Sequence, residues 1–382
     1  MFLTNQDMID LIDFRHELHR HPELSGEERD TARRVLTFLA PMKPDRVISG
    51  LGGHGIAAIF EGAKKGRTLL FRSELDALPI EELTAVPYRS TTPGKAHLCG
   101  HDGHTAALAA LGRGLARQRP ASGRVVLMFQ PAEENGAGAA AVIADPRFGE
   151  ISPDLCFSFH NMPGIPLGKV ALAEGPANCA SRGMKIVLDG KTAHASSPEH
   201  GTSPMRAVAL MMSALTGLGV ALPPAPHFAM ATVTHATMGE PTFGVAPGHA
   251  EIWVTLRTLT DDRMVRLCGD AEALARDIAE KQKLILSISY ADIFSHCENA
   301  PEAVEHLGRA LDAEGISHDR GDLPMRGSED FGRFGAIAPA AMFLLGAGEN
   351  VPSLHNPDYE FPDTLIETGA RIFMRVVRDV LG

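Results

Sequence analysis

The segment HLCGHDGHTA, residues 97–106, places three histidines, a cysteine and an aspartate close together. Thiolate and imidazole are good ligands for zinc, and they also bind manganese, cobalt or nickel at lower affinity. In an extended loop, side chains two residues apart point the same way, so Cys99 and His101 would present both donors to one ion. The segment therefore fits either a metal site or a cysteine nucleophile with a nearby base.

Two adjacent carboxylates follow an apolar stretch in QPAEENGAG, residues 130–138. Such a pair can lie in an ordinary solvated turn. In a metal site, however, an ion lowers the pKa of bound water, and a neighbouring carboxylate can take and deliver the released proton. The pair then predicts a division of tasks, in which Glu134 binds metal and Glu133 faces the cavity as the base.

Two further histidines complete a set of donors. His160 ends the apolar stretch of SFHNMPG, and His355 lies in the proline-flanked loop PSLHNPDYEF. Each alone could be a capping residue or an exposed loop residue. The full set comprises Cys99, His101, Glu134, His160 and His355. A catalytic zinc takes only three protein ligands, so five donors fit two ions that share a bridge. Sulfur can bridge two metals and neutral imidazole normally cannot, so Cys99 is the favoured bridging ligand.

The elements that must position these residues are typical of an α/β sheet. Helical periodicity over 5–40, interrupted at His21-Pro22 and Ser25-Gly26, predicts two helices. Strands are then expected at 55–60, 68–75, 124–130 and 154–160, with helices at 104–118 and 136–148. This alternation predicts a mixed, mostly parallel sheet flanked by helices, in which ligands bind at the carboxyl ends of strands.

The pattern changes after about residue 175. The expected order is a strand at 184–190, a helix at 203–219, strands at 227–236 and 249–259, a helix at 261–282 and a strand at 283–291. This βαββαβ order is that of a ferredoxin-like unit. It predicts an inserted domain over 178–291. Residues 1–177 and 292–382 then form the catalytic domain, with a strand at 340–346 and a final helix from about 363.

Composition narrows the function classes. The net charge of −11 and the lack of a Lys/Arg cluster exclude a general nucleic-acid binder. The chain has no uninterrupted run of 18 apolar residues, so we expect no membrane-spanning helix. The N-terminus lacks the apolar core of a signal peptide. Five widely spaced cysteines suggest no disulfide framework. We therefore expect a cytoplasmic protein whose partner is a small molecule, without nucleic-acid or membrane partners.

Eight motifs follow one another along most of the chain. They are RHELHRHPELSGEE (15–28), RSELDALPIEE (72–82), AHLCGHDGHTAAL (96–108), FQPAEENGAGA (129–139), FHNMPG (159–164), GKTAHASSP (190–198), RGSEDFG (326–332) and LHNPDYEFPD (354–363). Together they resemble the amidohydrolase family that contains hippurate hydrolases, aminoacylases and plant indoleacetyl-amino-acid hydrolases. The resemblance implies a di-metal catalytic domain and an inserted lid domain used for dimerisation.

Carried onto this sequence, the family's metal ligands fall on the five donors named above and its catalytic glutamate falls on Glu133. Asp76 would orient a ligand. His194, in the lid, resembles a histidine that steadies the oxyanion across the dimer. Arg257 could hold a substrate carboxylate in a bidentate fork, or pair with a surface neighbour. Gly244 stands where the family often has asparagine, so that side chain is missing for carboxylate recognition.

The residues and the resemblance together predict a metal-dependent amidohydrolase that cleaves N-acyl amino acids. It would use two divalent ions per chain, chosen from Zn, Mn, Co or Ni, and act as a homodimer through the lid. A dipeptidase or carboxypeptidase-type exopeptidase on the same scaffold is an alternative. A cysteine hydrolase using Cys99 is a further alternative, although it leaves Glu133, Glu134, His160 and His355 without a task. A non-catalytic binder is another, although the intact ligand set and Glu133 argue against it.

Overall fold

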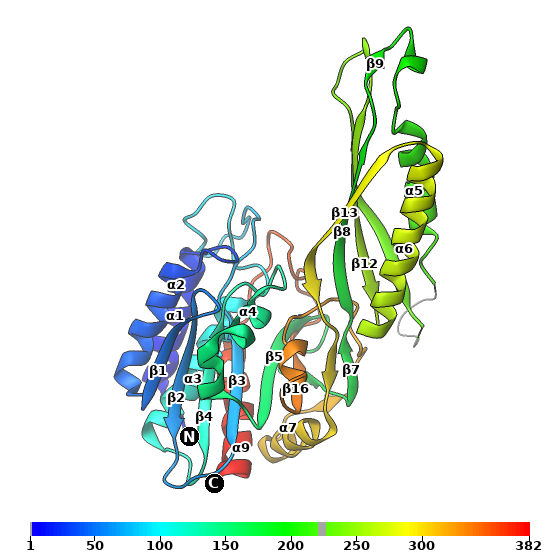
Figure 1. Cartoon of the computed structure of the whole chain (residues 1–382). Coiled ribbons are helices and arrows are strands. Elements are labelled where there is room, and N and C mark those ends of the chain that lie inside the picture. Colours follow the sequence, from blue (N-terminus) through cyan, green and yellow to red (C-terminus); the bar gives the residue numbers. More distant parts are fainter. Residues whose placement is uncertain (1, 221–226) are drawn as a thin grey trace. The chain divides into compact units, whose positions relative to one another are not determined.

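The computed structural model describes residues 2–220 and 227–382 (Figure 1). They form two compact units. The first contains Met1–Ala177, Cys297–Leu323 and Asp330–Gly382, and the second contains Asn178–His296 and Pro324–Glu329. The expected catalytic segment began at residue 292, but 292–296 and 324–329 belong to the second unit. One reason is that the backbone N–H of Cys179 donates to the carbonyl of Met325 at 3.2 Å, which ties the later segment to the second unit.

The first unit is built on an eight-stranded sheet with the order β1-β2-β4-β3-β5-β16-β6-β15. Its strands are β1 (Arg46–Leu51), β2 (Gly55–Glu61), β3 (Thr68–Glu74), β4 (Arg124–Gln130), β5 (Leu155–Pro163), β6 (Val170–Ala171), β15 (His318–Asp319) and β16 (Ala340–Gly348). The central strands β4, β3, β5 and β16 run parallel, whereas β1, β2 and β4 pair antiparallel. The expected mixed, mostly parallel sheet is therefore confirmed.

Helices of the first unit cover this sheet. They are α1 (Asn5–Arg20), α2 (Arg29–Leu39), α3 (His101–Arg117), α4 (Gly138–Ala144), α7 (Pro301–Glu314), α8 (Gly332–Gly335) and α9 (Thr364–Leu381), with short 3₁₀ turns at Ala40–Met42 and Pro146–Ile151. Figure 1 shows α4 in front of the sheet and α3 and α9 behind it. Among the described residues, no helix is both long and apolar enough to cross a membrane.

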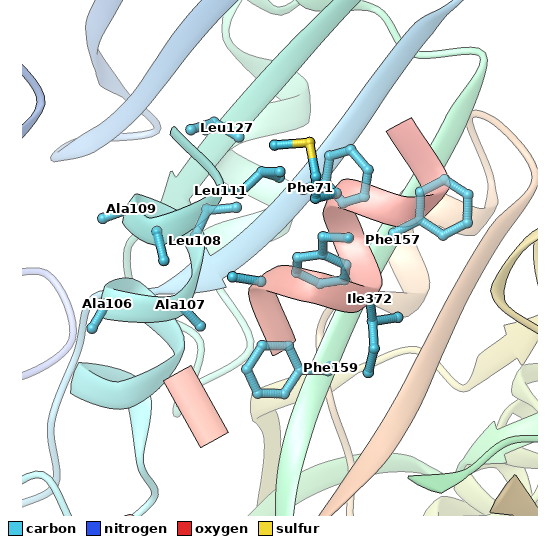
Figure 2. Close-up of a cluster of buried hydrophobic side chains, with 14 of the residues drawn as sticks. Phe71, Ala106, Ala107, Leu108, Ala109, Leu111, Leu127, Phe157, Phe159 and Ile372 are labelled. Atoms are coloured by element: carbon cyan, nitrogen blue, oxygen red, sulfur yellow. The ribbon is translucent and has the colours of Figure 1, made fainter. Parts of the chain in front are cut away.

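The core of the first unit lies between the sheet and helices α3 and α9. Figure 2 shows Phe71 of β3 and Phe157 of β5 in one cluster with Leu108 and Leu111 of α3 and Ile372 of α9. The rings of Phe71 and Phe157 stack with centroids 5.4 Å apart. Because α3 is rich in alanine, it packs closely against its neighbours and is buried along most of its length. This buried helix carries His101 at its first position.

The second unit is a four-stranded antiparallel sheet with the order β10-β12-β8-β13. Its elements are β8 (Ala180–Asp189), α5 (Met205–Thr216), β10 (Ala229–Met238), β12 (His249–Thr258), α6 (Asp261–Lys281) and β13 (Ile285–Phe294). The strand and helix order agrees with the expected ferredoxin-like unit. Two short strands of this unit, β9 (Ala193–His194) and β11 (Val245–Ala246), pair with each other. Strand β7 (Gly175–Asn178), which belongs to the first unit except for Asn178, pairs with β14 (Cys297–Asn299) of the first unit.

Candidate metal centre

Cys99 and His101 come together through a glycine turn. The prediction of an extended loop is wrong, because α3 begins at His101 and not at residue 104. Gly100 has a φ of 95°, in the left-handed region that glycine enters at little cost. A Cβ at this position would also collide with the side chain of Asn161. The two donors therefore converge because Gly100 turns the chain between them, and not because side chains alternate.

Glu133 and Glu134 follow β4 in a tight turn. Both face His101: its Nε2 lies 3.9 Å from Glu133 Oε2 and 3.8 Å from Glu134 Oε1. Glu133 is nearly buried, with 5% of its surface exposed, and the backbone N–H of Asp330 donates to its Oε1 at 3.4 Å. Both adjacent carboxylates therefore lie beside the same imidazole, His101.

His160 approaches the same site from β5. The sequence predicted that this strand ends at His160, but in the structure it continues to Pro163. Nδ1 of His160 donates to the carbonyl of Asn161 at 2.7 Å, and Nε2 lies 3.3 Å from Sγ of Cys99. Burial, together with the neighbouring His104, lowers the pKa of His160 to about 3. The ring is therefore neutral, which is the form that binds a metal.

His355 enters from the loop before α9. Its Nε2 lies 3.8 Å from Glu134 Oε2, and its side chain is half exposed. Its backbone N–H donates to the carbonyl of Leu98 at 2.9 Å, which ties this late segment to the motif that contains Cys99. Burial and the charge of His101 lower the pKa of His355.

Asp76 orients two members of the group. Nδ1 of His101 donates to the backbone carbonyl of Asp76 at 2.9 Å and lies 3.4 Å from its carboxylate. The other carboxylate oxygen of Asp76 accepts hydrogen bonds from the N–H of Glu134 at 2.9 Å and from Oγ of Ser25 at 2.7 Å. With Nδ1 of His101 held in this way, Nε2 is the atom aimed at the glutamates.

The residues present fit a pair of metal ions. Of the groups of three donor atoms that lie within 4.8 Å of one another among the described residues, three combine the expected donors and Glu133. They are Cys99, His101 and His160; Cys99, Glu134 and His355; and His101, Glu133 and Glu134. Within the described part of the chain, the buried Nε2 of His101 makes no hydrogen bond. Burial opposes a charged His101, but Asp76, Glu74 and Glu134 outweigh it and raise its pKa to about 10. The site therefore favours positive charge, and Cys99 belongs to two of the sets.

The two remaining candidates lie in the second unit. His194 ends β9, is exposed, and accepts a hydrogen bond at Nδ1 from the N–H of Ser196 at 3.2 Å. Arg257, on β12, donates to the carbonyl of Arg326 at 3.0 Å and to Oγ of Ser328 at 2.9 Å. Both acceptors belong to the second unit and both contacts are made by Nη1.

A buried polar network beneath the donors was missed from the sequence. Glu74 contacts Arg72 through one carboxylate oxygen, and its other oxygen lies 2.5 Å from Nδ1 of His104. His104 in turn contacts Asn161, and Asp330 accepts from Arg72 and Gln130. The third histidine of HLCGHDGHTA and the glutamate of RSELDALP were visible signals of this network.

Comparisons with known proteins agree with this geometry. The family model described as peptidase family M20/M25/M40 matches residues 70–379. A hippurate hydrolase of Campylobacter jejuni is 29% identical over 95% of this chain and 94% of its own. An N-acetyl-L-cysteine deacetylase of Bacillus subtilis is 32% identical over 93% of this chain and 84% of its own.

A solved structure shows the same fold along the whole chain. The Bacillus subtilis YXEP protein, described as a dinuclear metal binding peptidase from the M20 family, has a TM-score of 0.82 and 25% identity, and the match covers 99% of each chain. The fold, the grouped donors and the matched relatives point the same way: this chain is a metal-dependent hydrolase that belongs to the peptidase family M20/M25/M40.

Proposed function

We propose that the chain hydrolyses the amide bond of N-acyl amino acids, with Glu133 as its general acid and base. Cys99, His101, Glu134, His160 and His355 would hold two divalent ions, with Cys99 as the bridge. The observation that carries this proposal is the convergence of five donors and one further carboxylate, Glu133, from four separate segments of the first unit. The relatives described as hippurate hydrolase and as deacetylases support this substrate class.

Bound ions would polarise the scissile carbonyl and lower the pKa of the attacking water. The chain's own contribution centres on Glu133. Its Oε1 accepts from the N–H of Asp330, and its Oε2 faces His101. Oε2 would take the proton from water and deliver it to the leaving amine nitrogen. Asp76 keeps His101 and the backbone of Glu134 in place during both transfers.

His194 is proposed to stabilise the oxyanion in a partner's site within a homodimer. Because Nδ1 of His194 accepts a hydrogen bond from Ser196, the proton of the neutral ring lies on Nε2. An N–H of this kind is the donor that a developing oxyanion needs, and its loss costs about a hundredfold to a thousandfold in turnover. In a two-fold dimer such an exchange of residues is reciprocal.

Complementation tests the exchange between chains. His194→Ala and Glu133→Gln homodimers should both be nearly inactive, whereas a heterodimer of the two has one site with both defects and one with neither. In an equal mixture about half the dimers are mixed, so roughly a quarter of wild-type activity should return. Lack of recovery, with heterodimers confirmed by mass spectrometry, would contradict a role for His194 in the partner's site.

An exopeptidase on the same scaffold is the second candidate. A carboxypeptidase of Saccharolobus solfataricus is 29% identical over 88% of this chain and 85% of its own. Product analysis separates the two candidates when one library contains N-acetyl, N-benzoyl and longer acyl amino acids together with dipeptides, under added Mn²⁺, Zn²⁺ or Co²⁺. Release of free amino acids from dipeptides alone would favour the exopeptidase and contradict the amidohydrolase proposal.

A chelator tests the metal requirement against a cysteine nucleophile. The Cys99 thiol is buried beside Glu134 and Glu133, and these surroundings raise its pKa well above the ordinary value, whereas a nucleophilic cysteine needs a lowered pKa. Removal of metal should abolish turnover, and added Mn²⁺ or Zn²⁺ should restore it. Full activity of metal-free protein would favour Cys99 as nucleophile instead.

A further inference from the structure

The residue before the two glutamates has an unusual backbone. Ala132 has a φ of 52°, in the left-handed region, which is strained for any residue with a Cβ. Such conformations persist only where surrounding contacts hold them, and they gather at functional sites. Because Ala132 immediately precedes Glu133 and Glu134, its backbone angles set the direction in which both side chains leave the turn.

Two hydrogen bonds hold Ala132 in this conformation. Its N–H donates to Oε1 of Glu28 at 2.7 Å, and its carbonyl accepts from the N–H of Gly138 at 2.9 Å. Residue 138 must be glycine here, since a Cβ would collide with the carbonyl oxygen of Pro131. Both polar backbone groups of Ala132 are therefore engaged, one of them by a carboxylate from a distant part of the chain.

Glu28 is well placed for this task. It is fully buried, and its Oε1 also accepts from the N–H of Gly26 at 2.9 Å. Burial, reinforced by the nearby carboxylate of Asp76, raises the pKa of Glu28. A carboxylate is costly to bury without a specific partner, and here its partners are backbone N–H groups. No part of the proposed chemistry uses Glu28, although it ends the first motif of the chain.

The same segment reaches the other side of the glutamate pair. Oγ of Ser25 donates to Oδ2 of Asp76, the oxygen that also accepts from the N–H of Glu134. Residues 25–28 thus contact the turn directly at Ala132 and indirectly at Glu134. These two contacts fix the backbone on both sides of Glu133.

We propose that Glu28 is a positioning residue that holds Ala132 in its left-handed conformation, so that Glu133 and Glu134 point into the metal centre. The inference rests on the proposed function, because it assigns Glu28 a task in aligning the proposed base and ligand. It goes further than the proposed function because it names a carboxylate outside the reacting groups that determines how Glu133 and Glu134 are aligned.

The test compares Glu28→Gln with a matched control. Glu23 lies in the same segment, and its carboxylate accepts from the N–H of Thr31 at 2.6 Å, away from the turn. Glu28→Gln keeps the shape but weakens the charge-assisted bond. Amide hydrogen exchange at Ala132 should then accelerate about tenfold, Mn²⁺ affinity should fall, and kcat should drop at least tenfold with KM within about twofold. Misplacing a reacting group by about 1 Å costs on the order of a hundredfold. Glu23→Gln should change none of the three.

A second variant separates alignment from stability. Ala132→Gly removes the strain, because glycine enters this region freely, so the melting temperature should stay equal or rise. The turn nevertheless becomes freer, and kcat should fall. In the Ala132→Gly background, Glu28→Gln should lower stability less than in wild type, since the two residues are coupled.

Three outcomes would overturn the proposal. Exchange at Ala132 could be equal in Glu28→Gln and Glu23→Gln, kcat of folded Glu28→Gln could match wild type, or Ala132→Gly could keep full kcat. Wild type and Glu133→Gln are assayed in parallel. Equal turnover by those two would remove the proposed function of Glu133, while the exchange rate of Ala132 would still report whether Glu28 holds the turn.

Discussion

Replacement of Glu133 by glutamine should remove catalysis and leave the metal centre intact. Glu133→Gln keeps the volume of the side chain and an oxygen that can accept from the N–H of Asp330. It cannot take a proton. General acid–base catalysis contributes a hundredfold to ten-thousandfold, so turnover should fall by at least about a hundredfold, or roughly 2.7 kcal/mol of barrier. Because the backbone contacts persist, the melting temperature should shift by less than about 3 °C.

The assay combines kinetics with elemental analysis. The kcat of Glu133→Gln is measured beside the metal content of Glu133→Gln, Glu134→Gln and wild type after reconstitution with Mn²⁺. Glu134 faces both His101 and His355, so Glu134→Gln should lose metal as well as activity. Equal loss of metal in the two variants would refute the division of tasks between the glutamates.

Three further predictions follow from other contacts. Cys99→Ser should weaken binding of both ions, and calorimetry showing loss of only one would make the sulfur a terminal ligand. Phe157→Ala should lower the free energy of unfolding by about 3–5 kcal/mol in urea titrations, because a fully buried ring leaves a cavity beside Phe71. For His19, burial lowers the pKa, but the hydrogen bonds to Asp102 and Glu82 outweigh it and raise the pKa to about 9. The contribution of protonated His19 to the free energy of unfolding is therefore fully present below the unfolded pKa of about 6.5. It is lost as the pH rises through about 9. The free energy of unfolding of the metal-free protein, measured by urea titration, should fall by up to about 3 kcal/mol over this pH range, and that of His19→Gln should fall by less.

The pattern of apolar residues in the sequence was most accurate for elements whose apolar residues are continuous and buried. Strand β4 covers the residues expected for it, because all but its first residue are buried. Strand β1 was missed, since only Ile48 and Leu51 are buried and the rest face solvent. Helix α7 was also missed, although the spacing of Ala303, Leu307 and Leu311 is a helical signal.

The candidate donors could be named from the sequence because Cys, His and Glu stand in short, distinctive motifs, and the structure brings their side chains close together. Their geometry could not be predicted, since it depends on backbone conformations that have no periodic signature. The left-handed Gly100 determines where α3 begins, and the left-handed Ala132 sets the direction of the glutamates. The contact between Glu28 and Ala132 joins positions 104 residues apart, which no local pattern reveals.

The position of β16 in the sheet has a consequence for synthesis of the chain on the ribosome. This strand pairs in parallel with β5, yet β5 ends at Pro163 and β16 begins at Ala340. At about 5–20 residues per second, the two strands emerge roughly 10–35 s apart. During that interval one edge of β5 has no neighbour in the sheet, and an open, apolar edge invites pairing with other nascent chains. Both segments of the second unit, Asn178–His296 and Pro324–Glu329, are synthesised before β16, so this unit can fold while the catalytic sheet still lacks its last central strand.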